Sequence, residues 1–397
     1  MVEKKMLVVL LLATLLIITA SEAAAADGVT TTAVSIGIST PLSGPAALWG
    51  MSGLGAKTWA DYINDNGGVH GRKINVILRD DGYNPSRALA NLTAIKGEVF
   101  CVTALLGAAI VRATKDFLAE NKIPLILPLC SARLWENDPW EKQRWVFSNW
   151  PDSINEAEFL TNYAVTELGS KKVSIFYQND EMGHPGLKGL NLALANLSGR
   201  ASLGVAIPYE VTERALATHA LKLKEGGADS LLLYTTPTHG AIILKEMAKL
   251  DYRPKVLTVF ALGDPIMYSI AGADVWEGVY PAVSANISLP GEPEADRVIE
   301  ILKKYEPKIT GKEYLALIGA VSMMYTIEGL KNAGRDLTPE TMLKGMEMIK
   351  DWKPEGMGAP TTFGPGRRNG VNGIRIMRAE KGKHVPISGY AIFEPIF

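Results

Sequence analysis

The sequence predicts an α/β protein of two lobes, each built on a parallel sheet, with a chain that crosses between them more than once. Short apolar runs alternate with helical patterns, the chain is long for one hydrophobic core, and two irregular stretches interrupt the alternation. Strands that alternate with helices form right-handed βαβ units. Apolar runs without polar alternation are typical of strands covered on both faces.

The predicted strands and helices follow one another from residue 34 onwards. The apolar runs expected to form strands are residues 34–39, 73–80, 99–107, 123–129, 171–178, 201–209, 229–236 and 254–261. The helical patterns are residues 53–65, 85–95, 110–121, 155–168, 185–197, 214–226 and 239–250. Residues 294–350 are mostly helical in pattern, and residues 361–394 resemble a meander of paired strands.

The N-terminal segment is expected to be a cleaved signal peptide. Residues 1–5 form a short segment with charged side chains, and residues 6–20 form an apolar run. Small residues then lead to a cleavage site at Ala24-Ala25-Ala26. The apolar run is shorter than a spanning helix requires. Cleavage after Ala26 leaves a chain above the size at which one core usually divides, so we predict an exported protein of two domains.

Two irregular stretches, residues 136–153 and 278–294, are rich in proline, glycine or tryptophan and interrupt the alternation. From them we predict that residues 27–148 and 284–352 form lobe 1. Residues 149–283 and 353–397 are predicted to form lobe 2.

Charge and motifs exclude several function classes. The chain has 41 basic and 42 acidic residues without long runs of one sign, which argues against nucleic acid or an anionic membrane surface as a partner. The nucleophile elbow, the H-E-x-x-H pattern, the phosphate-binding loop and G-x-G-x-x-G are absent, and the five histidines lack metal-ligand spacing. We therefore expect no enzyme, no cofactor and no metal site, and we interpret Asp80-Asp81 as a structural turn.

The two cysteines are expected to be free and mostly buried. Cys101 opens one predicted strand, whereas Cys130 follows the end of the next. Parallel neighbouring strands would place them more than roughly 10 Å apart, beyond the roughly 7 Å that a disulfide tolerates.

Loops after the predicted strands carry the candidate site. Small, polar or aromatic residues follow strand ends at residues 40–50, 105–110, 129–132, 179–186, 234–240 and 260–264. One such loop is usually only a turn, but open parallel sheets bind ligands beyond the carboxyl ends of their strands. Six loops at corresponding places predict a ligand cleft.

Several stretches resemble landmarks of the leucine/isoleucine/valine-type periplasmic binding proteins, the solute receptors of ABC importers. They are residues 36–50, 67–88, 123–132, 179–190 and 277–282. The resemblance implies the type I binding-protein fold, in which two Rossmann-like lobes with parallel sheets are joined by three hinge crossovers and close on a ligand. It also implies a small organic ligand, a membrane permease as partner, no cofactor, and a monomer.

The resemblance implies a set of ligand-binding residues as well. Carried over by position, they are Ser43, Trp49, Ala108, Ala109, Leu129, Ser131, Met182, Thr236, Phe260 and Asp264. Trp49 stands where family members often have a tyrosine, and Ala108 and Ala109 lie in the loop that holds an amino acid's carboxylate. Asp264 is the acid nearest the place expected for an ammonium partner.

Two ligand classes stay open at this point. A branched-chain or other hydrophobic amino acid fits if Asp264 reaches its ammonium group. If it does not, an aromatic or aliphatic carboxylate without an amine becomes competitive, because an unpaired buried charge costs several kcal/mol. A ligand sensor that partners a signalling receptor is the alternative function, and a hydrolase is a third.

Overall fold

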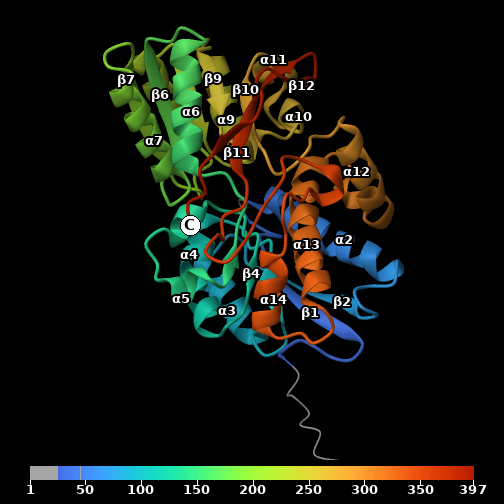
Figure 1. Ribbon diagram of the computed structural model, residues 1–397. Coiled ribbons are helices and arrows are strands. Elements are labelled where there is room, and N and C mark those ends of the chain that lie inside the picture. The colour runs from blue at the N-terminus through green and yellow to red at the C-terminus, as the bar shows by residue number, and fades with distance from the viewer. Residues whose placement is uncertain (1–25, 45) are drawn as a thin grey trace, which may run out of the picture.

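A computed structural model describes residues 26–44 and 46–397 as two α/β lobes, one above the other in Figure 1. The predicted signal peptide, residues 1–26, lies outside the described residues except for Ala26. In the described part of the chain, no helix is both long enough and apolar enough to cross a bilayer.

Lobe 1 is built on a parallel sheet of five strands in the order β2-β1-β3-β4-β5. The strands are β1 (Ala33–Thr40), β2 (Lys73–Asp80), β3 (Cys101–Thr103), β4 (Leu125–Ile126) and β5 (Val146–Phe147). The early helices are η1 (Ala47–Trp49), α2 (Gly50–Asp65), α3 (Pro85–Ile95), α4 (Ala108–Glu120), η2 (Ala132–Trp135) and α5 (Trp140–Gln143). Later segments complete this lobe: α12 (Pro293–Tyr305), η4 (Pro307–Ile309), α13 (Glu313–Ala333) and α14 (Pro339–Glu347).

Helix α13 is the central helix of lobe 1. Its sequence is apolar on nearly all sides, which is typical of a buried helix, and most of its residues are buried. It lies beside α2 (Figure 1), and glycines allow the two backbones to approach closely. A Cβ atom on Gly55 would lie 2.0 Å from the carbonyl oxygen of Ala316, and one on Gly319 would lie 1.7 Å from that of Ser52.

Lobe 2 is built on a mixed sheet in which β12-β11-β10-β9-β8-β6-β7 are neighbours and β13 also pairs with β11. The parallel strands are β6 (Lys172–Gln178), β7 (Ser202–Tyr209), β8 (Ser230–Tyr234), β9 (Lys255–Thr258) and β10 (Tyr280–Ser284). The antiparallel strands are β11 (Asn372–Glu380), β12 (Lys383–Pro386) and β13 (Ala391–Phe393). The helices are α6 (Ser153–Thr166), α7 (Gly183–Asn196), α8 (Ala217–Gly226), α9 (Pro237–Lys249), η3 (Phe260–Leu262), α10 (Met267–Ala271) and α11 (Ala273–Trp276), and η5 (Pro354–Gly356) lies before β11.

Three segments carry the chain between the lobes: after β5, after β10 and after α14. The C-terminal tail then returns from lobe 2 towards lobe 1 (Figure 1). The carbonyl of Phe397 accepts hydrogen bonds from the N–H groups of Arg368 and Asn369, both at 3.0 Å. Its ring packs against Trp135 at 6.2 Å, so the tail is a further contact between the lobes.

The predicted fold class is confirmed, and each of the predicted strands and helices up to residue 261 overlaps an observed element of the same type. The meander expected near the C-terminus is β11 to β13, which makes the second sheet mixed. Strands β5 and β10 were missed because both lie inside stretches read as irregular. The predicted lobe boundaries, residues 27–148 with 284–352 and 149–283 with 353–397, remain our proposal for where the lobes divide.

Candidate ligand-binding site

A pocket with about 590 Å³ of empty space, counted to its mouth, lies between the lobes near the carboxyl ends of the parallel strands. It is lined by Trp49, Tyr83, Leu106, Gly107, Ala108, Leu129, Cys130, Ser131, Trp150, Ser153, Glu181, Met182, Thr236, Val259, Phe260 and Ala261. This is where an open α/β sheet is expected to bind a ligand.

Seven of the ten residues proposed from the sequence are brought together here. They are Trp49, Ala108, Leu129, Ser131, Met182, Thr236 and Phe260. Ser43, Ala109 and Asp264 are not part of the lining. Contact of any of these residues with a ligand stays a prediction.

Ser43 belongs to a turn that Asp80 organises. The Ser43 hydroxyl donates to Asp80 Oδ2 at 2.6 Å, and the N–H groups of Leu42 and Ser43 donate to Oδ1. Asp81 accepts hydrogen bonds from the Ser39 hydroxyl and the Tyr83 N–H. The acidic pair therefore has the contacts of a structural turn.

Asp264 is buried outside the pocket. Its Oδ1 accepts the N–H of Ile266 at 2.8 Å, whereas its Oδ2 has no hydrogen-bond partner among the described residues. Burial raises the pKa of the Asp264 carboxyl to about 7. The short helix η3 turns the chain between Phe260, which lines the pocket, and Asp264, which does not.

Three aromatic side chains form the apolar wall of the pocket. The ring of Trp150 lies 6.3 Å from that of Trp49 and 4.4 Å from that of Phe260, the second pair in an edge-on arrangement at 77°. Such edge-on contacts are favourable for aromatic rings. The wall joins residues of both lobes and the first crossover, and it presents a largely apolar surface to a ligand.

Trp150 and Tyr83 were missed as site residues. Trp150 lies in the first irregular stretch, whose tryptophan content was a usable signal, and Tyr83 follows the acidic turn with φ 61°. Tyr83 packs on Gly107, where a Cβ atom would lie 2.7 Å from its ring. Gly107 itself has φ 101°, a conformation that favours glycine.

The start of α4 is the main group of hydrogen-bond donors at the pocket. Gly107 precedes the helix and has no side chain to cap it, and the first backbone bond back to its carbonyl comes from Val111. The N–H groups of the first helical turn have no partner within the helix. Together with the helix dipole they favour an anionic group.

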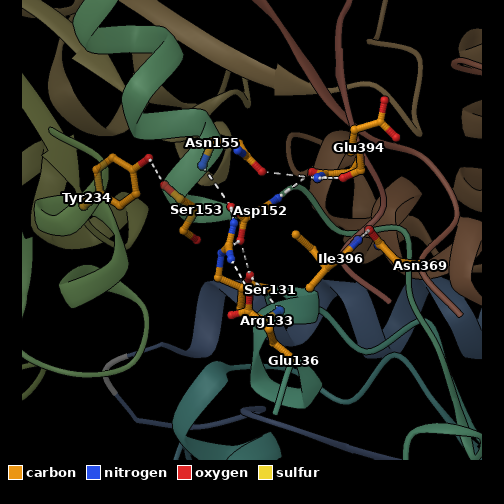
Figure 2. Close-up of polar contacts among 11 residues, drawn as sticks. Ser131, Arg133, Glu136, Asp152, Ser153, Asn155, Tyr234, Asn369, Glu394 and Ile396 are labelled. Carbon is orange, nitrogen blue, oxygen red and sulfur yellow. Dashed lines mark hydrogen bonds and ion pairs between the residues drawn. The ribbon is translucent and has the colours of Figure 1, made fainter. Parts of the chain in front are cut away.

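Ser131 connects the pocket to a polar network at the crossovers, shown in Figure 2. Its hydroxyl donates to Asp152 at 3.0 Å, and Asp152 forms an ion pair with Arg133 at 2.8 Å. The Asp152 N–H donates to the side chain of Asn372 at the start of β11, and Asn372 donates to the Glu394 carbonyl. One network thus joins a lobe 1 loop, two crossovers and the C-terminal tail.

Glu156 lies behind the pocket wall, fully buried on α6. Its Oε1 accepts the Phe260 N–H at 2.8 Å, and its Oε2 lies 3.3 Å from the donating hydroxyl of Tyr234. Burial raises the pKa of the Glu156 carboxyl to about 8. The side chain is therefore neutral at pH 7 and holds Phe260 in place.

Replacing Glu156 with glutamine should flatten part of the pH dependence of stability. A carboxyl whose pKa is raised on folding stabilises the protein fully below its unfolded value of 4.5 and loses this contribution as the pH rises through about 8. Its contribution to the slope is at most about 1.4 kcal/mol per pH unit. The free energy of unfolding of Glu156→Gln should equal that of the parent at pH 4 and exceed it at pH 8.

Urea unfolding at both pH values measures this difference. Glu120→Gln, at an exposed position on α4, is the control and should follow the parent throughout. A Glu156→Gln protein that loses stability between pH 4 and 8 as steeply as the parent would contradict a raised pKa.

Cys101 and Cys130 are both free and buried, as predicted. Cys130 also lines the pocket. Burial raises the pKa of both thiols, so each is a neutral side chain at pH 7.

Comparison with known proteins agrees with this architecture. Residues 33–383 match the model of the periplasmic binding protein family. Leu/Ile/Val-binding protein homolog 3 of Brucella melitensis is 25% identical over 250 residues, 61% of this chain and 65% of that protein. Leu/Ile/Val-binding protein homolog 1 of Brucella suis is 22% identical over 320 residues, 79% of this chain and 82% of that protein.

Two solved structures share the fold. A branched chain amino acid ABC transporter from Thermus thermophilus with bound valine has a TM-score of 0.81 and 20% identity, covering 91% of this chain and 97% of that one. A fatty acid ABC transporter substrate-binding protein from Thermomonospora curvata has a TM-score of 0.77 and 20% identity. The match covers 93% of this chain and 95% of that one. With the family match over most of its length, this chain belongs to the periplasmic binding protein family.

Proposed function

We propose that this protein is the periplasmic solute-binding component of an ABC importer and that it holds a small amphipathic ligand between its lobes. The observation that carries this proposal is the pocket itself. It lies between two sheets, has an aromatic wall from Trp49, Trp150 and Phe260, and has an uncapped helix start on one side. An apolar wall opposite free N–H groups suits a ligand with an apolar body and one anionic end.

The family match supports the binding role, because its members are solute-binding proteins rather than enzymes. Of the two solved structures of this fold named above, one contains bound valine and the other belongs to a fatty acid transporter. Both compounds combine a carboxylate with an apolar chain, which is the ligand type that we propose here. Three crossovers allow the lobes to close on such a ligand as a hinge, and a permease would receive it.

Replacing Trp150 with leucine should weaken ligand binding roughly 30-fold, because a central aromatic contact is worth about 2 kcal/mol. Calorimetry on residues 27–397 with hydrophobic carboxylates and hydrophobic amino acids measures the effect. Trp140→Leu is the matched control, since Trp140 is exposed on α5 and does not line the pocket.

Trp49→Leu provides a second test at the same wall. The melting temperature of each ligand-free variant shows that it is folded. A Trp150→Leu protein that binds as tightly as the parent would contradict this location of the site, and a parent protein that binds no member of the panel would overturn the proposed function.

A further inference from the structure

We infer that the ligand is a hydrophobic monocarboxylate without an amine, an aromatic or branched aliphatic acid rather than an amino acid. This inference rests on the proposed function, and it concerns the charge that the pocket accepts. An amino acid brings an ammonium group as well as a carboxylate. A buried ammonium group is strongly disfavoured unless a carboxylate pairs with it.

Among the described residues of the lining, the one carboxylate is already part of an ion pair. Glu181 is the one acid among the described residues of the lining. Its Oε1 already lies 2.8 Å from Nε of Arg112, which projects from α4 on the opposite lobe. A ligand ammonium would have to compete with a guanidinium that is already in place.

The other acids near the pocket do not line it, and their carboxyl groups contact other side chains or lie buried. Asp152 is fully buried and paired with Arg133, and it is not part of the lining. Glu156 faces the Phe260 N–H and the Tyr234 hydroxyl behind the wall. Asp264, which the sequence suggested as the ammonium partner, is buried outside the lining.

Two of the four hydroxyl groups of the lining, those of Ser131 and Thr236, are already engaged. The Ser131 hydroxyl donates to Asp152 and accepts the N–H of Arg133 at 3.3 Å. Thr236 Oγ1 lies 2.7 Å from Nδ1 of His239. An ammonium group has three donors to satisfy, and these side chains have little acceptor capacity left.

The groove outside the pocket, which shares Ser131 and Glu181 with it, carries three basic and two acidic side chains. Arg112 pairs with Glu181 and Arg133 pairs with Glu136, and Lys188 is the third basic side chain. Together with the start of α4, this arrangement favours approach and retention of an anion. A ligand with net charge −1 matches it, and a zwitterion gains less from it.

Matched ligand pairs that differ in the amine test the inference. Residues 27–397 would be titrated in a calorimeter with isocaproate against leucine, and with hydrocinnamate against phenylalanine. We expect the amine-free member of at least one pair to bind roughly 100-fold more tightly. Equal or tighter binding of leucine or phenylalanine would overturn the inference and leave the proposed function standing, whereas no binding of any of the four would overturn both.

Glu181→Gln adds a second readout. If Glu181 pairs with Arg112 and not with the ligand, the variant should bind the amine-free acid at least as tightly as the parent does. A several-fold gain in affinity is expected where Arg112, freed from Glu181, turns towards the ligand. Glu120→Gln, at an exposed position on α4 outside both the pocket and the groove, is the matched control and should bind like the parent. A roughly tenfold or greater loss of affinity for leucine or phenylalanine in Glu181→Gln, with binding of the amine-free acid unchanged, would mean that Glu181 pairs with the ligand ammonium and would overturn the inference.

Discussion

Replacing Arg133 with methionine should lower the free energy of unfolding by about 3–5 kcal/mol, the usual cost of leaving a buried charge without its partner. Asp152 is 0% exposed, and its carboxylate pairs with Arg133 at 2.8 Å. Without the guanidinium, the donors that remain to the Asp152 carboxylate among the described residues are the Ser131 hydroxyl and the Asn155 N–H. Denaturant unfolding of the parent and the variant at pH 7 measures the difference.

The control is an ion pair at the surface. Arg297 and Glu355 are 57% and 45% exposed, with 3.2 Å between their charged atoms. Arg297→Met should cost no more than about 1 kcal/mol. Similar losses in the two variants would show that the Asp152 network contributes no more to stability than a surface pair does.

Replacing Gly319 with alanine should destabilise the protein by about 3 kcal/mol, the upper part of the range for overpacked cores. The new methyl group would lie 1.7 Å from the Ser52 carbonyl oxygen, so α2 and α13 would have to move apart. Helix propensity alone predicts the opposite, since alanine is favoured over glycine by about 1 kcal/mol. The sign of the change therefore decides between helix packing and propensity.

Gly97→Ala is the matched control for this substitution. A Cβ atom on Gly97 would meet nothing within 4 Å, and an alanine at such a site is neutral or slightly stabilising. Thermal and urea unfolding of both variants provide the comparison. A Gly319→Ala protein at least as stable as the parent would show that the two helices do not depend on this close contact.

Most of the fold could be predicted because long apolar runs and helical periodicity are local signals. Strand β5 could not, since Val146 and Phe147 are two buried residues inside a stretch rich in tryptophan, proline and charge. Strand β10 was hidden in the same way, because Pro281 interrupts it and the stretch after it contains further proline and glycine. Pairing with neighbours, rather than local pattern, makes both of them strands.

The site was predictable where a loop directly follows a strand. Ala108 is part of the lining, but a helix turns by about 100° per residue, so the adjacent Ala109 is not. Asp264 follows η3, whose turn the sequence does not show. Trp150 reaches the pocket from a crossover, and its position depends on how the two lobes are joined.

The order of segments along the chain also has a consequence for folding. His70 and Lys331 contact each other across 261 positions, near where α2 packs on α13. The apolar face of α2 that packs on α13 therefore stays uncovered until residues 313–333 have been synthesised. Contacts of such long range slow folding, and the incomplete lobe exposes apolar surface in the meantime. Both lobes depend on the last third of the chain, so neither lobe is complete until most of the polypeptide has been synthesised.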